Sequence, residues 1–466
     1  MLRRGQSIDG CGANDASGDP QVSEHASLYE SVFSGCPVEW EIVPFADAIN
    51  FQEGPGILAK DFREEGVPLL RLRNIERPFV DLVGCNFLDP DMVESRWPHF
   101  RVVPGDLLVS TSGTLGRVSI ATQASAGSIP YTGIIRMRPA RVDVDAGFIR
   151  YFLMSPLFQL QAEASAVGSV LRHFGPSHLR EMSFPVPSSN EQRTIAGVLG
   201  ALDDRIEQNR RTARALERLA QAIFRAWFVD FEPVKAKAAG AVSFPSMPQA
   251  IFDALPTHFI DTEIGAVPDG WEVGGTPNIA TLSKVQVNPR EHANEVFDHF
   301  SIPAFDADTY AVVEFGEAIK SNKFLVSEGC VLLSKLNPRI ARIWLPPPPR
   351  GRRQVASTEF LVFVPKSTFD RHYIYCQFQQ SSFREELAQS ASGTSNSHQR
   401  VRPDDVLHKS IIVPPSPVRK GFADITDPLF ALSTANHTES AKLTEVRDYL
   451  LPRLVGGQVR MEVTHA

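Results

Sequence analysis

The sequence lacks the features of membrane-spanning, secreted and zinc-bound proteins. Its 466 residues contain no unbroken apolar run of the roughly 18 residues that a membrane helix needs. Met1–Arg4 is followed by polar residues instead of an apolar segment, so we expect no secretory signal. The cysteines are scattered, form no C-x-x-C pair and stand at Cys11, Cys36, Cys85, Cys330 and Cys376. This usage predicts a cytoplasmic protein without a disulfide framework or a metal site.

Familiar catalytic motifs are also missing. The sequence has no G-x-x-x-x-G-K-[ST] phosphate loop, no G-x-G-x-x-G turn, no H-E-x-x-H and no G-x-S-x-G elbow. Asn288-Pro289-Arg290 and Asn337-Pro338-Arg339 lack the second proline and the aromatic residue of the amino-methyltransferase motif. We therefore expect no catalytic residue and no cofactor bound by this chain. A stand-alone methyltransferase or nuclease with an unrecognised motif is an alternative hypothesis.

The composition is that of a folded protein with an uneven charge distribution. Apolar residues make up 43% of the chain and charged residues 22%, close to the globular average. The net charge of −7 argues against a nucleic-acid partner at first sight. However, residues 315–409 carry fourteen Lys or Arg against eight Asp or Glu, whereas residues 251–314 carry two against eleven. A basic surface on part of an acidic chain is therefore compatible with DNA binding.

Two long segments have the periodicity of paired helices. Ser188 or Ser189 followed by Glu191 or Gln192 resembles a capping box, and about 40 residues without proline follow. Apolar residues and one asparagine then recur in steps of three and four, as in a coiled-coil seam, at Leu202, Ile206, Asn209, Leu216 and Ile223. A second segment has a similar pattern at Leu429, Asn436, Leu443, Val446 and Leu450, and we expect Pro452 to end its regular part.

The two segments match each other at a shift of 227 residues. This shift pairs Leu202 with Leu429 and Asn209 with Asn436. An asparagine at the same seam position in both helices predicts a fixed register. A long amphipathic helix inside a single domain is the alternative, and a coiled-coil scaffold whose globular ends bind protein is another.

The globular segments repeat as well, which predicts a tandem. Phe148 and Phe158 match Tyr373 and Phe383 at a shift of 225. The dipeptide Trp40-Glu41 recurs as Trp271-Glu272. The predicted domain order is a poorly ordered leader (1–37), a globular domain (38–187), a central helix (188–235), a connector (236–270), a second globular domain (271–415), a distal helix (416–458) and a tail (459–466).

These motifs together resemble the specificity (S) subunit of type I restriction-modification systems, over about residues 38–462. The most specific stretches are Asn190-Glu191-Gln192-Arg193-Thr194-Ile195-Ala196, its continuation to Phe228, and Leu450-Leu451-Pro452-Arg453-Leu454-Val455-Gly456-Gly457. The resemblance implies an α+β fold with two mixed α/β target recognition domains in pseudo-symmetric tandem. Two long helices, paired as an antiparallel coiled coil, would separate them.

The resemblance also implies a function. Each recognition domain would read one half of a split site in double-stranded DNA, and the chain itself would be non-catalytic. Two methyltransferase subunits would dock on it and carry S-adenosylmethionine, and a full complex would add two restriction subunits that use ATP and Mg²⁺.

Polar residues at strand ends and on loops are the candidate DNA contacts. Arginine and asparagine can pair bidentately with guanine and adenine in the major groove. In the first domain the candidates are Arg71, Arg73, Asn74, Ser112, Thr114, Arg117, Arg172 and His173. In the second they are Lys320, Asn322, Lys323, Lys335, Asn337, Arg339, Arg342, Ser397, His398, Gln399, Arg400 and Arg402. For each of them, a solvated loop or a salt bridge is the alternative, and we expect Glu359 to order a neighbouring arginine.

Overall fold

The computed structural model describes residues 32–111, 116–165, 174–307, 311–391 and 399–460. They form two compact units. The N-terminal unit contains the described residues up to Asp204 together with those from Thr444 onward, and the C-terminal unit contains Arg205–Leu443. Each unit therefore includes about half of each of the two long helices, α7 (Ser189–Phe228) and α14 (Ser416–Val455).

The N-terminal unit has two four-stranded sheets with different strand orders. The first is antiparallel with the order β2-β9-β6-β7, formed by Ile49–Glu53, Ile134–Pro139, Leu107–Ser110 and Val118–Ile120. The second has the order β3-β5-β4-β8, formed by Phe62–Arg63, Asn86–Leu88, Val67–Leu70 and Ile129–Pro130. A two-stranded ribbon pairs β1 (Glu41–Pro44) with β10 (Ser183–Val186). The helices are α2 (Phe45–Ala48), α3 (Pro90–Arg96), α4 (Ala146–Met154), α5 (Pro156–Ser165) and α6 (Pro176–Glu181).

The C-terminal unit repeats part of this design. Its sheet β14-β22-β19-β20 is also antiparallel and is formed by Ala280–Ser283, Phe360–Pro365, Val331–Ser334 and Ile343–Trp344. A ribbon of β13 (Glu272–Gly274) with β23 (Ile411–Val413) corresponds to β1 with β10. Helices α11 (Asp370–Gln379), α12 (Ser381–Ser390) and α13 (Pro403–Leu407) follow the sheet as α4, α5 and α6 do. The α+β class and the tandem of related domains are confirmed.

The second sheet of the C-terminal unit is larger than its counterpart. Its order is β15-β18-β21-β16-β17, formed by Gln286–Val287, Lys323–Leu325, Arg353–Ala356, Val296–Phe300 and Val312–Phe315. Helix α10 (Ile302–Asp306) lies between β16 and β17 in the chain. The strands of these four sheets and of the two ribbons fall inside the predicted ranges 38–187 and 271–415.

Residues 236–270, predicted to be a connector, contribute to the core of the C-terminal unit. They contain α9 (Gln249–Asp253), the hairpin of β11 (Phe259–Thr262) with β12 (Gly265–Pro268), and the end of α8 (Glu232–Ala238). Met247, Phe252, Leu255 and Val267 are buried in that core. The proline- and glycine-rich composition suggested a linker, but it is the composition of short elements joined by tight turns.

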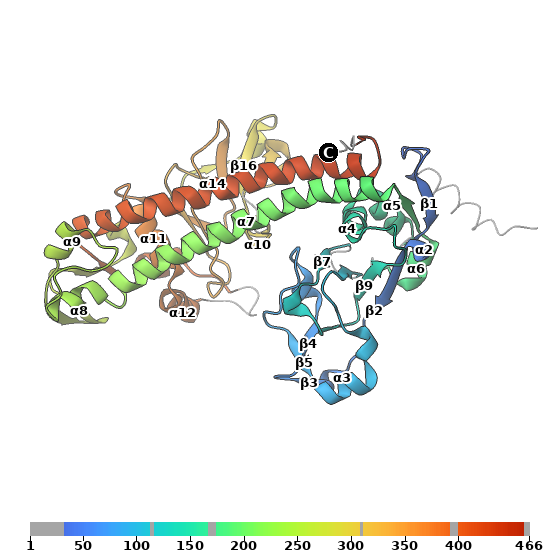
Figure 1. Ribbon diagram of the computed structural model, residues 1–466. Coiled ribbons are helices and arrows are strands. Elements are labelled where there is room, and N and C mark those ends of the chain that lie inside the picture. The colour runs from blue at the N-terminus through green and yellow to red at the C-terminus, as the bar shows by residue number, and fades with distance from the viewer. Residues whose placement is uncertain (1–31, 112–115, 166–173, 308–310, 392–398, 461–466) are drawn as a thin grey trace, which may run out of the picture. The chain divides into compact units, whose positions relative to one another are not determined.

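Within each unit α7 and α14 lie side by side and run antiparallel (Figure 1). In the N-terminal unit Arg447 of α14 donates to Asp203 of α7 at 2.9 Å. In the C-terminal unit Ser433 donates to Glu217 at 3.0 Å, and Arg205 bonds Glu439 through two nitrogens at 3.0 and 3.1 Å. Ser188 caps the start of α7 because its hydroxyl accepts the Glu191 N–H at 3.3 Å.

Most of the predicted seam positions are only half-buried on both helices. On α7, Ile206 and Asn209 are buried, and Leu202, Leu216 and Ile223 are half-buried. On α14 the buried positions include Phe430, Ser433, Ser440 and Leu451, and two of them, Phe430 and Leu451, directly follow predicted residues. Val446 is 46% exposed, and Leu429, Leu443 and Leu450 are only half-buried. Serines occupy some buried positions of the helix pair, and the hydropathy pattern therefore predicted leucines near them instead.

The role predicted for the two seam asparagines and the helix end predicted at Pro452 also differ from the structure. Asn209 is buried, but Asn436 is half-buried and donates to the Leu432 carbonyl of its own helix at 2.8 Å. An amide that bonds its own helix does not set an interhelical register. Helix α14 continues through Pro452 to Val455, because Leu454 and Val455 pack in the core of the N-terminal unit.

Candidate nucleic-acid interface

Two loops of the C-terminal unit, predicted separately from the sequence, are joined in the structure. The first leaves β19 at Lys335, and the second contains Gln399 and Arg400. The Asn337 N–H donates to the Gln399 carbonyl at 2.9 Å, and the Val401 N–H donates to the Lys335 carbonyl at 3.0 Å. Leu336 and Arg400 form an isolated antiparallel bridge. These bonds bring four of the candidate DNA contacts into one cluster, which we call the reading cluster: Lys335, Asn337, Gln399 and Arg400.

A tight turn presents Arg339 beside this cluster. Asn337 adopts a left-handed conformation with φ of 50°, which asparagine tolerates better than most residues, and its carbonyl accepts the Ile340 N–H at 2.9 Å. Arg384 donates to the Arg339 carbonyl at 2.7 Å and holds the turn from α12. The Arg339 side chain is exposed. The backbone is therefore fixed while the guanidinium is available to a ligand.

Arg400 already has a protein partner. Its Nε and Nη2 donate to the carboxylate of Glu359, with the shortest distance 3.1 Å, and this bonding raises the pKa of Arg400. The Arg400 side chain is 49% exposed, so the pair lies at the surface. Glu359 thus orders a neighbouring arginine, as the sequence suggested, and partly offsets the positive charge of the reading cluster.

Two other candidates in this unit are structural. Lys323 is 7% exposed, its ammonium donates to the carbonyl and hydroxyl of Ser321 at 3.0 and 2.7 Å, and burial lowers its pKa. Arg342 is 8% exposed and bonds Asp306 at 2.6 and 2.9 Å. A base reader must reach solvent, so the prediction of DNA contact is wrong for both.

The remaining candidates of the C-terminal unit are exposed or lie outside the described residues. Lys320 and Asn322 are exposed on the turn before β18. Arg402 is exposed, and its backbone N–H donates to Asp405 at the start of α13. Ser397 and His398 are outside the described residues.

In the N-terminal unit the candidates divide in the same way. Asn74 is 1% exposed, and its amide donates to the Asp81 carbonyl and accepts the Arg71 N–H, so it shapes a turn and the DNA prediction is wrong. Arg71 is exposed and lies 5.9 Å from the Tyr131 ring centre. Arg73 is exposed and donates to the Gly84 carbonyl. Four candidates, Ser112, Thr114, Arg172 and His173, lie outside the described residues.

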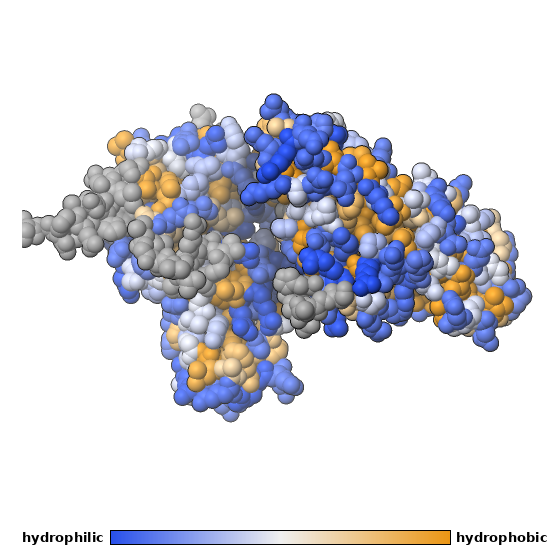
Figure 2. Space-filling view, turned by 180° about the vertical axis from the view of Figure 1, so that it is seen from behind, coloured by the Kyte–Doolittle hydropathy of each residue, from blue (hydrophilic) through white to orange (hydrophobic). Residues whose placement is uncertain are grey.

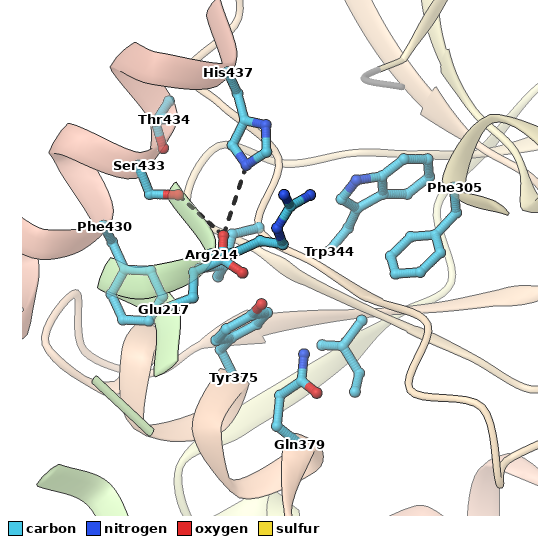
Figure 3. Close-up of a pocket in the computed structure, with 12 residues that line it drawn as sticks. Arg214, Glu217, Phe305, Trp344, Tyr375, Gln379, Phe430, Ser433, Thr434 and His437 are labelled. Atoms are coloured by element: carbon cyan, nitrogen blue, oxygen red, sulfur yellow. Dashed lines mark hydrogen bonds and ion pairs between the residues drawn. The ribbon is translucent and has the colours of Figure 1, made fainter. Parts of the chain in front are cut away.

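Each unit has a pocket at an equivalent place beside the long helices. In the C-terminal unit a pocket of about 200 Å³ lies among α7, α10, β20, α11 and α14. Figure 3 shows Ser433 and His437 directed at Glu217, with Arg214 and Trp344 on the opposite side. Its remaining lining is largely aromatic, with Phe305, Tyr375 and Phe430.

The pocket of the N-terminal unit is more polar. Its volume is about 290 Å³, and four arginines line it: Arg77, Arg117, Arg150 and Arg447. Of these, only Arg117 was a candidate from the sequence; it lies 3.6 Å from Glu76. Arg150 gave a signal that could have been used, because it interrupts the apolar run of α4 and must find a partner there. Arg447 gave no such signal, since it stands among polar residues of α14.

The surface elsewhere is mainly hydrophilic. On the face drawn in Figure 2, apolar residues form scattered patches. Among the described residues, no three His, Cys, Asp or Glu side chains are arranged to hold a metal ion. None of the helices in this part of the chain is long and apolar enough to cross a membrane.

Comparisons with known proteins match type I specificity subunits, and two of these matches cover 91% of the chain. Residues 37–218 match the family model of the type I restriction modification DNA specificity domain. The chain is 25% identical over 449 residues to the type I restriction enzyme MjaIX specificity subunit of Methanocaldococcus jannaschii, covering 91% of this chain and 95% of the relative. It is 23% identical to the HindI specificity subunit of Haemophilus influenzae, over 60% of this chain and 69% of the relative. The fold resembles the type I S subunit from M. genitalium, with a TM-score of 0.51, 14% identity, and coverage of 91% and 97%.

Proposed function

We propose that the chain is a specificity subunit of a type I restriction-modification system, and that it reads a two-part DNA sequence without catalysing a reaction itself. The observation that carries this proposal is the reading cluster with Arg339. Hydrogen bonds of the backbone fix both loops, while Lys335, Gln399 and Arg339 keep side chains that can reach DNA. Arginine can pair with guanine and glutamine with adenine in the major groove.

The repetition of the fold supports a bipartite site. Two domains that share the order of one antiparallel sheet and the helices that follow it can each read one half of a sequence. Helices α7 and α14 each have 40 residues, which corresponds to a length of ~60 Å at ~1.5 Å per residue. We propose that the helix pair serves as a spacer, because this length exceeds the ~34 Å of one DNA turn.

The partners follow from the family. We propose that methyltransferase subunits dock on this chain and carry S-adenosylmethionine, and that restriction subunits supply the chemistry that uses ATP and Mg²⁺. The family's arrangement is two subunits of each kind. The chain then contributes sequence recognition, and the purified chain with S-adenosylmethionine and DNA is expected to transfer no methyl group.

The test is Arg339→Ala in the complex with the cognate methyltransferase. Loss of a bidentate base contact costs about 1–3 kcal/mol, so affinity for the cognate duplex should fall by roughly 5- to 150-fold and discrimination at one base pair should relax. Fluorescence anisotropy measures the affinity, and genome-wide methylation mapping measures the specificity.

Lys366→Ala is the matched control. Lys366 is exposed directly after the last residue of β22. The loop that carries Arg339 begins at Lys335, directly after the last residue of β19, and these two strands are antiparallel. The two lysines therefore lie at opposite ends of one sheet. Equal effects of the two substitutions, or a methylation pattern that does not change when this chain is removed, would contradict the proposal.

A further inference from the structure

The arginine pocket of the N-terminal unit gathers four guanidinium groups. Arg77 follows the turn η2 (Leu72–Ile75), Arg117 precedes β7, Arg150 lies on α4 and Arg447 on α14. The acidic residues that line the pocket are Glu76 and Asp203. Asp81 and Asp448, which lie outside this lining, pair with Arg77 and Arg447, so the four guanidinium groups have four carboxylate partners, of which only Asp203 is buried.

Two of these arginines share one buried carboxylate. Asp203 accepts from Arg150 at 2.8 Å and from Arg447 at 2.9 Å, and its side chain is 5% exposed. The hydroxyl of Tyr151 also donates to Asp203, at 3.0 Å. Arg447 also bonds Asp448 at 2.7 Å, but that carboxylate is 58% exposed and such a pair is weak, so an incoming anion can replace it.

Arg150 also has an unused donor. The residue is 6% exposed, its Nη2 bonds Asp203 and its Nη1 bonds Tyr151 at 3.2 Å. Its Nε is buried and has no hydrogen-bond partner among the described residues. Leaving a buried charged donor unsatisfied is costly, so an acceptor that enters the pocket would relieve this cost.

The two outer arginines are free to respond to a ligand. Arg77 pairs with Asp81 at 3.3 Å and Arg117 with Glu76 at 3.6 Å, and the arginine side chains are 62% and 42% exposed. Exposed ion pairs of this kind hold their partners weakly. Both guanidinium groups can therefore turn toward an anion without a large loss of stability.

We propose that this pocket binds a phosphate group, and that the phosphate belongs to the backbone of bound DNA. Phosphate presents several acceptor oxygens that match the planar fork of guanidinium, and arginine is the usual residue at such sites. The assignment to DNA rests on the proposed function. The phosphate chemistry rests only on the four converging guanidinium groups and on the unsatisfied Nε.

The other unit shows that the fold itself does not require this arrangement. Val118 of the arginine pocket corresponds to Ile343, Arg150 to Tyr375 and Asp203 to Phe430, at shifts of 225 to 227 residues. The pocket of the C-terminal unit is lined by one arginine, Arg214, one carboxylate and one histidine. It has no comparable group of arginines and provides an internal control.

The experiment uses the chain in complex with its methyltransferase partner and the double variant R77Q/R117Q. Arg214→Gln is the matched control in the equivalent pocket, and Arg193→Gln controls for removal of an exposed charge on α7. Affinities for cognate and unrelated duplexes are measured against salt concentration. A second series titrates inorganic phosphate against chloride at equal ionic strength and follows the melting temperature.

We expect the double variant to bind both duplexes about tenfold or more weakly, by the same factor for each. The slope of log K against log salt should become shallower by about one, because one phosphate contact is lost. The Arg214 and Arg193 controls should leave the slope unchanged. Duplexes with single neutral methylphosphonates should identify one position where wild-type affinity falls and the double variant is insensitive.

Other outcomes decide the source of the phosphate or refute the site. If inorganic phosphate stabilises the wild type but not the double variant, and duplex affinities are equal, the pocket takes a free phosphate and the assignment to DNA is wrong. If neither series separates the double variant from its controls, the pocket is not a phosphate site. A wild-type complex without sequence preference would refute the proposed function, while both series would still test the pocket.

Discussion

Substitution of Asp203 by asparagine should destabilise the N-terminal unit specifically. The carboxylate connects three helices, because it lies on α7 and bonds Arg150 of α4 and Arg447 of α14. Asparagine keeps the shape but leaves two guanidinium groups without their shared charge. Breaking a buried ion pair costs about 3–5 kcal/mol, and we expect about 3, since the Arg447 side chain is 20% exposed and also bonds Asp448.

The assay is differential scanning calorimetry of the full chain. For a unit of this size, about 3 kcal/mol corresponds to a decrease of roughly 6–12 °C in the melting temperature of its transition. Asp204→Asn is the matched control, because Asp204 is the adjacent, exposed carboxylate. A loss below about 1 kcal/mol, which is what an exposed ion pair contributes, would show that the carboxylate does not hold the helices together.

Two further substitutions test the electrostatics of the C-terminal unit. Burial lowers the pKa of His372 from its ordinary 6.5, although its bond to Asp427 opposes this shift. Below pH 6.5 the unfolded state then binds more protons than the folded state, so stability should fall with decreasing pH, and His372→Gln should flatten this dependence in urea unfolding. Glu359→Gln should release Arg400, raise affinity for unrelated duplexes and steepen the salt dependence in anisotropy titrations; unchanged salt dependence would mean that Arg400 does not approach DNA.

The sequence predicted the long helices well because their length and capping are local properties. Ser188 caps α7 as expected, and the periodicity of Ile206 and Asn209 marks the buried face. On both helices some buried positions are not the ones that hydropathy marks, because burial depends on the partner surface. Ser433 lies in the seam since Glu217 accepts its hydroxyl hydrogen bond across the pair, and no single-helix pattern contains that information.

The DNA candidates show a similar limit. The sequence places polar residues near strand ends, but it could not distinguish an exposed Arg339 from a buried Arg342 three residues later. That difference is due to Asp306, which lies 36 positions away in the chain and binds Arg342 from α10. Arg150 and Arg447 were missed for the same reason, because Asp203 brings together residues almost 300 positions apart.

The N-terminal unit is completed by residues that the ribosome adds more than 200 positions after its sheets. Leu451, Leu454 and Val455 fill its core, and Arg460 bonds Glu191, which also accepts the indole N–H of Trp40. During synthesis the core of the N-terminal unit therefore stays incomplete until the end of α14 has been made. A premature stop codon near position 440 would consequently damage the half that was translated first, and the product would be exposed to proteolysis at both ends.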